Sequence, residues 1–456
     1  MAASTSSGGE GGTDTGTDAP PTDPCATPTN PPDPKCLDDS TTLFVSPTGS
    51  DTNPGTKAAP LQTVNAAVNA ATNDKKRVYV CEGTYAENVK IGKTLALIGG
   101  INCAWNAKGT RAKIIPAKGI AVTIAKAATV SITELSIAAN ADSQVKSDSA
   151  IAVFVSESQS VLLKSVDVTA GPGTDGVNGA SGDDTPNYSG GIATAGNSTA
   201  DGTGATAPTC GTCTDATFSA AGKGASLAGV PDPGSASPAV GGDNAGGNMG
   251  ATCFAGNPGA PGLASAQAAG ATSPGSLSAD GWKGGVAAAK GGNGKPGQGG
   301  GGGGFQAGIG GGSGGCGGCG GSGGTPGGNG GSSFAVLAFN SVVVVEDSSL
   351  KSAKGGAGGT GGKGQDGQFR GNNGGGACPG GLGGHGAGGA GGGGGAGGHS
   401  APVGFIGDKP TTTRSTLAPG EPGAVGPGGS AGLGPGNAAP PGGEGSKGTA
   451  RDLLAL

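Results

Sequence analysis

Apolar side chains recur along the middle of this chain with a fixed spacing. They alternate with polar residues over positions 122–137, and an equivalent set lies 31 residues further on. The two sets are Val122, Ile124, Val130, Ile132, Leu135 and Ile137, and Val153, Val155, Val161, Leu163, Val166 and Val168. Alternation predicts short strands. A fixed repeat of such strands predicts a β-solenoid, in which coils stack and their inward side chains form one continuous core.

The same apolar spacing returns after a long interruption. The third set is Ala335, Leu337, Val343, Val345, Ser348 and Leu350. We therefore expect residues 334–353 to form the coil that follows 150–170, with the chain between them inserted. Glycine-rich sequence follows both coils at the equivalent point, so both glycine-rich arms are expected on the same side of the solenoid. An earlier coil is predicted by Val89, Ile91, Leu95 and Leu97.

The N-terminal part of the apolar region combines strand and helix patterns. Leu43 and Val45 begin a short strand, and Val78 and Val80 begin another. Between them, turn-forming residues precede an apolar set at helical spacing. That set is Leu61, Val64, Val68 and Ala71, with Pro60 in the first turn of the expected helix.

Several short motifs in this region resemble the N-terminal signature of a family of unknown function in the pectin-lyase-like superfamily. The motifs are Val45-Ser46-Pro47, Gly49-Ser50-Asp51, Asn53-Pro54-Gly55-Thr56, Pro60, Thr63, Val78-Tyr79-Val80 and Gly83-Thr84-Tyr85. The resemblance covers about residues 43–100. It implies an all-β fold, a right-handed parallel β-helix with a short helix capping its first coil.

Glycine dominates the remainder of the chain, with 107 glycines and 31 prolines among 456 residues. We expect four parts: a disordered acidic Thr/Pro/Gly tether at 1–41, a β-helix at 42–170 plus 332–354, a glycine-rich insert arm at 171–331, and a glycine-rich C-terminal arm at 355–456. Glycine recurs at every third position in 173–182, 355–367 and 420–432. Three residues per turn is the polyproline-II period, so we expect packed polyglycine-II helices. Disorder and a collagen triple helix are the alternatives.

The glycine-rich half resembles, in composition only, the glycine-rich repeat proteins called PGRS and the polyglycine-II antifreeze proteins. A net charge of −5, the absence of a basic run and 3% aromatic residues argue against a nucleic-acid partner. No apolar run approaches the length of a membrane span.

The sequence of the tether bears on the cellular location of the protein. No charged stretch followed by an apolar run precedes it. The alternatives are a cytosolic chain and a chain numbered after removal of its signal. We expect the second, a secreted or outer-surface protein, lipid-anchored through the tether, because such acidic Thr/Pro segments follow the attachment point of bacterial lipoproteins and ten cysteines favour export.

The cysteines suggest a disulfide framework. Residues three apart in a polyproline-II helix lie about 9 Å apart, beyond the roughly 7 Å reach of a disulfide between Cα atoms. Cys316 and Cys319 are therefore expected to pair with another segment, and Cys210 and Cys213 have the matching spacing. The other candidate pairs are Cys253 with Cys378, Cys81 with Cys103, and Cys25 with Cys36. A four-cysteine zinc site and a thioredoxin-like redox site are the alternatives for the two C-x-x-C motifs.

Candidate catalytic groups are sparse. His385 and His399 lie in glycine-rich surroundings and are expected to be solvated loop residues. Two sets share register positions in the turn between strand pairs and should form ladders on stacked coils. They are Glu134, Ser165 and Asp347, and Thr133, Lys164 and Glu346. Acids on such a ladder suit Ca²⁺ binding or a glycosidase pair, but solvated turn residues are the expected interpretation. We predict no catalytic residue, no cofactor and no metal site.

Three functions follow. The first is a non-catalytic surface protein, structural or adhesive, with surface glycans or matrix as its partners. The second is a carbohydrate-binding or carbohydrate-active protein of the polysaccharide lyase or hydrolase type, suggested by superfamily analogy alone. The third is binding to ice or another crystalline surface, suggested by regular glycine arrays.

Overall fold

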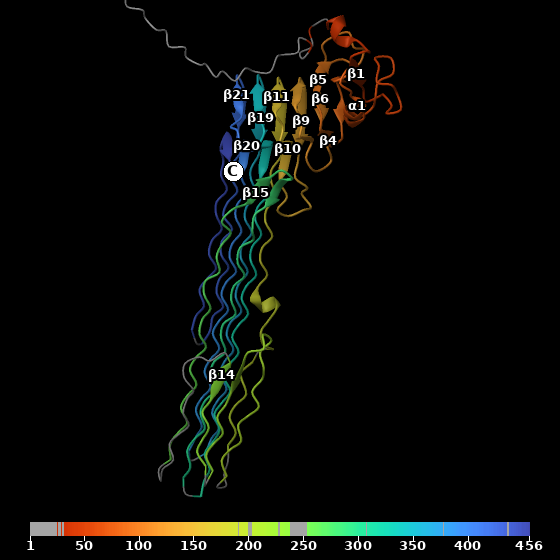
Figure 1. Cartoon of the computed structure of the whole chain (residues 1–456). Coiled ribbons are helices and arrows are strands. Elements are labelled where there is room, and N and C mark those ends of the chain that lie inside the picture. Colours follow the sequence, from red (N-terminus) through yellow and green to blue (C-terminus); the bar gives the residue numbers. More distant parts are fainter. Residues whose placement is uncertain are drawn as a thin grey trace, which may run out of the picture.

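Three parallel sheets form the folded body of the chain, seen at the top of the computed structural model in Figure 1. The structure describes residues 25, 29, 32–189, 191–198, 203–226, 229–237, 253–306, 308–376, 378–435 and 437–456. The first sheet contains β1 (Thr42–Val45), β2 (Arg77–Cys81), β5 (Leu95–Ile101), β8 (Thr129–Thr133), β11 (Ser160–Lys164), β18 (Val343–Glu346) and β21 (Thr411–Thr413).

The other two sheets run beside it. The second contains β4 (Val89–Ile91), β7 (Val122–Ala125), β10 (Ala150–Ser156), β17 (Ser333–Phe339), β20 (Ser400–Ile406) and β23 (Leu453–Ala455). The third contains β3 (Thr84–Tyr85), β6 (Ala112–Ile114), β9 (Leu135–Ala139), β12 (Asp167–Ala170), β19 (Ser349–Ser352) and β22 (Thr416–Ala418). From β3 onward the chain passes from sheet to sheet before it returns to pair in parallel with the previous coil, which is the topology of a parallel β-helix.

The 31-residue register predicted from the apolar pattern is confirmed. Val122 pairs with Val153 and Val130 with Val161, and the later strands β11 and β18 pair Val161 with Val343. The prediction was wrong by one residue in β17, where Val153 faces Val336 instead of Ala335. Four residues lie between Ser156 and Val161, whereas three lie between their partners Phe339 and Val343, and this shifts the register.

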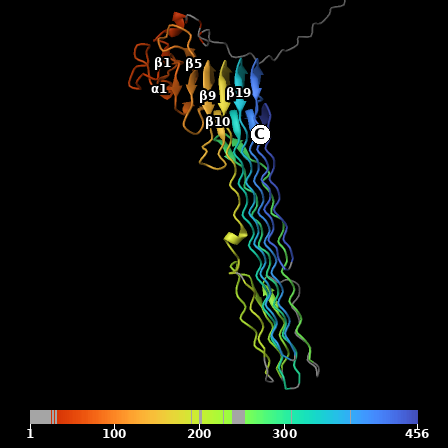
Figure 2. The same ribbon diagram turned by 180° about the vertical axis from the view of Figure 1, so that it is seen from behind.

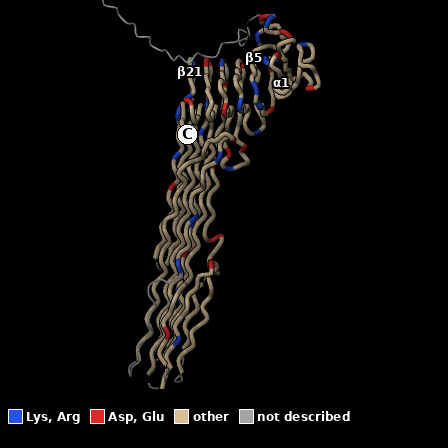
Figure 3. The backbone as a smooth tube through the Cα atoms, viewed as in Figure 1, with Lys and Arg blue, Asp and Glu red and all other residues tan. Residues whose placement is uncertain are grey.

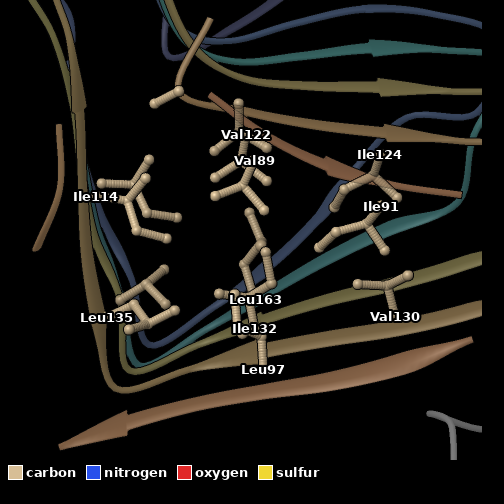
Figure 4. Close-up of a cluster of buried hydrophobic side chains, with 14 of the residues drawn as sticks. Val89, Ile91, Leu97, Ile114, Val122, Ile124, Val130, Ile132, Leu135 and Leu163 are labelled. Atoms are coloured by element: carbon tan, nitrogen blue, oxygen red, sulfur yellow. The ribbon is translucent and has the colours of Figure 1, made fainter. Parts of the chain in front are cut away.

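The core is a column of inward-facing aliphatic side chains between the three sheets. In Figure 4, Val89 lies against Val122 and Ile91 against Ile124, while Leu97, Ile132 and Leu163 stack along one wall. All of these side chains are buried. Stacking like on like across coils gives each strand the same packing environment, and burying an aliphatic side chain in this way contributes about 1.5–3 kcal/mol.

A short helix covers the N-terminal end of this column. Thr63 is the N-cap of α1 (Val64–Ala70), and its hydroxyl accepts a hydrogen bond from the N–H of Ala66. The prediction that Leu61 and Pro60 belong to this helix was wrong, because Leu61 bridges Val45 of β1 in an extended conformation. α1 contacts β1, β2 and β4.

Part of the expected tether packs on the outside of the β-helix. The 3₁₀ helix η1 (Pro34–Leu37) and the Cys25–Cys36 disulfide join an outer apolar cluster with Phe44, Tyr79 and Trp105. The Tyr79 hydroxyl donates to the Cys25 carbonyl over 2.8 Å. The assignment of 1–41 wholly to a disordered tether is therefore corrected for its described residues, since the cluster gives them apolar surface to bury. Most of 1–31 lies outside the described residues.

The glycine-rich segments form one long arm beside the body, as Figures 1 and 2 show from opposite sides. They leave the β-helix after β12, β19 and β22 and return at β17, β20 and β23. All three excursions therefore start from the third sheet and end at the second, which confirms that the arms lie on one side.

The extent of the C-terminal arm differs from the prediction. Residues 400–418 form a further coil (β20, β21 and β22) and 453–455 add β23, although 355–456 was expected to be arm throughout. β20 pairs Val336 with Val403 and Leu337 with Gly404. Gly404, Thr411 and Thr412 lie opposite Leu337, Val344 and Val345 of the preceding coil, so the apolar pattern of this coil is too weak to identify from the sequence.

Main-chain hydrogen bonds hold the arm together in three layers. Residues 171–182, 353–376 and 419–433 make the first layer, 311–332, 378–399 and 437–449 the second, and 253–272 with 285–306 the third. Between segments the bonds recur every third residue. For example, Gly355, Gly358 and Gly361 donate in turn to Glu421, Ala424 and Pro427.

The central segment, 378–399, bonds to six neighbours. Its N–H groups donate to 353–376, 285–306 and 437–449, and its carbonyls accept from 311–333, 419–432 and 253–272. Ala387, Ala390 and Ala396 are fully buried. A Cβ on Gly389 would overlap the carbonyl oxygen of Ser322. Around the central segment the interior of the arm therefore consists largely of backbone and methyl groups, because larger side chains would separate the segments.

Side chains supply acceptors where the first layer lacks a further segment. The N–H of Ala357 donates to Asp175 Oδ1 over 2.8 Å, that of Thr360 to Asn178 Oδ1 over 3.0 Å, and that of Leu433 to Asp366 Oδ1 over 2.8 Å. This satisfies N–H groups that would otherwise depend on water.

Two hairpins and a short 3₁₀ helix, η2 (Gly182–Asp184), interrupt the arm. β13 (Phe218–Ala220) pairs with β14 (Ser235–Ser237), and β15 (Gly275–Ser278) with β16 (Gly281–Gly284). The second hairpin places Trp282 against Phe334, with ring centroids 5.1 Å apart, on the outer face of the second sheet. It anchors the arm to the body.

Substitution of a central glycine is expected to loosen the arm while leaving the β-helix intact. Gly389→Ala should lower the local free energy of unfolding by roughly 1–3 kcal/mol, since a methyl group there must push the Ser322 carbonyl away. Hydrogen exchange of arm peptides, followed by mass spectrometry, measures this change. Gly284→Ala is the control, because a Cβ at Gly284 has nothing within 4 Å. Equal exchange in both variants would contradict the backbone-packed interior.

Candidate functional site

The predicted polar ladder lies at the corner between the first and third sheets. Glu134, Ser165 and Asp347 occupy equivalent positions with φ of 51°, 52° and 51°, and Arg414 continues the series at 48°. The neighbouring set is also in register, since Lys164 pairs with Thr133 on one side and Glu346 on the other. A left-handed conformation repeated at one corner turns each coil in the same way. Stacking of both sets is thus confirmed.

The acids of the ladder are paired with cations. Glu134 is buried and accepts from Arg111 Nε over 3.3 Å, with Lys108 Nζ at 3.8 Å. Arg111, which precedes β6, also bonds Asp167 of β12, two coils further on. These contacts connect successive coils.

The pairing continues toward the C-terminal coils. Lys164 Nζ lies 3.1 Å from Glu346 Oε2. Arg414 binds Asp347 through two N–H···O bonds of 2.6 and 2.9 Å, and this bonding lowers the pKa of Asp347. A carboxyl group with a lowered pKa is a poor general acid near neutral pH. The ladder therefore contributes structure across coils, and its geometry favours neither acid catalysis nor an open cation site.

Both histidines are packed more closely than a solvated loop residue. His399 Nδ1 accepts from the N–H of Thr449 over 3.0 Å, and its ring meets Trp282 edge to face with centroids 6.0 Å apart. Burial lowers the pKa of His399 to about 4. The expectation of a solvated histidine was wrong here, because the β15–β16 hairpin covers the position where the arm joins β20.

His385 occupies a more open position within the arm. Its Nδ1 accepts from the N–H of Arg370 over 3.2 Å, and Phe369 contacts its ring at a centroid distance of 5.7 Å. Burial, assisted by the charge of Arg370, lowers its pKa. Both imidazoles thus accept hydrogen bonds from main-chain N–H groups of neighbouring segments.

The cysteines form the pairs considered in the sequence. Cys210 bonds Cys316 and Cys213 bonds Cys319, with Cα atoms 5.5 and 5.8 Å apart. The remaining bridges are Cys25–Cys36, Cys81–Cys103 and Cys253–Cys378. All ten cysteines are described and none is free, so the zinc and thiol-redox interpretations of the C-x-x-C motifs were wrong. Five disulfides fit an extracellular protein.

Two surface cavities were not foreseen. One, of about 500 Å³, lies at the corner between the second and first sheets and is lined by Glu157, Ser158, Gln159, Asn340, Val342 and Asp408. The other, of about 630 Å³, separates the η1 segment from the loop around Trp105 and is lined by Pro32, Pro34, Leu37, Lys57, Ala58, Ala104, Trp105 and Asn106. Residues of the first cavity come from three coils, and only the fold brings them together. Glu157 and Asn340 share one register position, with φ of 49° and 44°.

Within the described ranges, no group of three or more His, Cys, Asp or Glu side chains is placed to hold a metal ion. The same part of the chain has no helix long and apolar enough to cross a membrane.

Comparison with known proteins identifies one region. Residues 47–110 match a family described as a protein of unknown function, DUF1565, which is associated with right-handed β-helices. The matched range spans α1 and the first coils, in agreement with the resemblance found in the sequence. No curated protein matches the chain.

The pH dependence of stability is expected to report on His399. The folded state disfavours the imidazolium, so the unfolded chain binds more protons between the ordinary pKa of 6.5 and the folded value of about 4. Stability is fully present above pH 6.5 and should fall by roughly 3 kcal/mol as the pH drops to 4. Chemical denaturation across this range should show the loss in the parent chain. A His399→Gln variant should lack this component, whereas His385→Gln should largely retain it. An unchanged pH profile in His399→Gln would refute this assignment.

Proposed function

We propose that this chain is a non-catalytic, exported structural or adhesive protein of the bacterial cell surface. The single observation that supports the proposal most is the central segment 378–399, bonded to six neighbours through its backbone. Such an interior gives a long, stiff projection. The β-helix then serves as the base from which the arm projects.

The arm is best interpreted as a polyglycine-II bundle. Its bonds recur at every third residue, which is the period of that helix. Glycine occupies the positions where neighbouring carbonyls approach most closely, as at Gly389 and Gly392. A collagen triple helix has three chains around one axis, whereas this arrangement has layers of segments in both directions. Each segment bonds sideways to several others, so a sheet-like stack of threefold helices describes it better.

Our proposal that the protein lies at the cell surface rests on its disulfides and on the composition of the arm. Disulfides persist outside the reducing cytosol, and those at Cys210–Cys316 and Cys213–Cys319 link arm segments to each other. The arm carries few charges, as Figure 3 shows. Thr360, Ala424 and Pro427 are exposed on its first layer. A regular surface of small, uncharged groups suits contact with polysaccharide or matrix, and the N-terminal tether supplies a lipid-linked attachment.

Adhesion is expected to depend on this first layer. Particles coated with the oxidised chain should be retained under flow on surfaces bearing cell-wall polysaccharide or matrix protein. Ala424→Glu should reduce retention, because a carboxylate there requires desolvation at the contact. Ala117→Glu, at an exposed site on the β-helix, is the matched control. Equal retention by both variants would exclude the first layer as the adhesive surface, and retention no greater than on bare surfaces would exclude adhesion.

Carbohydrate binding is the second candidate, favoured by the cavity of about 500 Å³ at the corner of the second and first sheets. Glu157, Gln159, Asn340 and Asp408 line it, and carboxylates and amides are suitable partners for sugar hydroxyls. The cavity crosses coils, which would align an extended glycan with the axis of the β-helix.

A glycan array tests this second candidate. Binding of a defined oligosaccharide that is lost in Asn340→Ala and kept in Lys118→Ala would support the cavity. Release of reducing ends from the same oligosaccharide would instead indicate a glycosidase or lyase. An array without any bound glycan would leave the structural role as the only one supported.

A further inference from the structure

The last coil of the β-helix and the arm segments next to it present a continuous open edge. β21, β22 and β23 are the outermost strands of the three sheets. They continue into the arm through 419–433 and 437–449, which bond to each other and to the second and third layers. We call this set, β21 to β23 with 419–433 and 437–449, the C-terminal edge.

Main-chain groups along this edge lack partners among the described residues. In the segment 419–433, every third N–H donates inward, as Gly423, Gly426 and Gly429 do. The N–H groups of Val425, Gly428 and Ala431 have no described acceptor. These N–H groups without a described acceptor recur every third residue, which is also the spacing of the hydrogen bonds between segments inside the arm. Unpaired edges of this kind are templates for a further chain.

The two ends of the β-helix differ in how they are covered. At the N-terminal end α1 packs over the core column. At the other end Phe405 closes the column together with Leu417 and Leu453, which are only partly buried. No described element covers these side chains. An occupant of the edge therefore gains apolar contact as well as hydrogen bonds.

Charge on the outermost arm segment indicates which occupant fits. Glu444 and Lys447 are both exposed, and neither makes an ion pair with a described residue. They lie one three-residue period apart. When two copies of 437–449 run antiparallel about a twofold axis between these positions, Glu444 of one faces Lys447 of the other, and the reverse pair forms by symmetry. The charge pattern is self-complementary in this arrangement, and the N–H groups without a described acceptor and the partly covered core adjoin it.

We infer that the C-terminal edge is an interface with a second copy of this chain, formed by antiparallel apposition of the two arms. The interface is isologous, with Glu444 and Lys447 as reciprocal ion pairs and main-chain bonds beside them. Segment 419–433 belongs both to this edge and to the proposed adhesive layer, but the inference rests on Glu444, Lys447 and the open edge and is tested by association of the chain with itself, without an adhesive surface.

The full, oxidised chain tests this inference in sedimentation equilibrium. A species of twice the 41.8 kDa chain mass is expected, dissociating on dilution. Glu444→Lys replaces two ion pairs by two like-charge contacts. Its dissociation constant should rise about tenfold, as should that of Lys447→Glu. The double variant E444K/K447E recreates both pairs with exchanged signs and should restore the parent value.

Controls separate the edge from other surfaces. Lys146→Glu changes the charge of an exposed residue in the loop before β10 and should leave the dimer unchanged. Circular dichroism of each variant checks that the fold is retained. A monomer at all concentrations overturns the inference. A dimer unaffected by either single charge reversal, or not restored in the double variant, assigns the contact to a different surface and overturns it as well.

Discussion

Lateral hydrogen bonding between glycine-rich backbones is the constraint on which the arm depends. Each such bond contributes little net free energy, since water competes for both partners. The bonds are numerous, however, and in the second layer they satisfy a segment on all sides. Ordering glycine costs more conformational entropy than ordering any other residue. The arm offsets that cost with disulfides, with the β15–β16 hairpin, and with segments that the β-helix already holds side by side.

The β-helix provides that alignment through a different interaction. Its core is aliphatic and its corners are fixed by left-handed residues and by ion pairs such as Glu134 with Arg111, in which the carboxylate is buried. The spacing between hydrogen-bonded strands of neighbouring coils also suits hydrogen bonds between neighbouring arm segments. Excursions from one corner therefore start in register, and the three-residue bonding pattern continues from the sheets into the arm.

Much of this architecture could be predicted from the sequence because two periods are visible in it. The alternation at Val130 and Ile132 recurs at Val161 and Leu163, and glycine at every third place defines the arms. The coil containing Val403 could not be found, since Gly404, Thr411 and Thr412 lie opposite Leu337, Val344 and Val345 of the preceding coil. Burial of His399 depends on Trp282, a residue over a hundred positions earlier in a hairpin without a strong pattern. The cavity beside Asn340 likewise requires the fold.

The direction of the segments has a consequence for folding. Every segment of the first layer runs away from the β-helix and every segment of the second layer runs back. The central segment 378–399 finds its partners both before and after itself in the chain, as far apart as 253–272 and 437–449. Contacts between residues so far apart in the sequence form late in folding. The segment also has almost no apolar surface with which to collapse beforehand. During synthesis or export, the interior of the arm therefore remains incomplete until residues 437–449 have emerged. Residues 437–449 thus complete an arm whose first segments lie more than two hundred residues earlier in the chain.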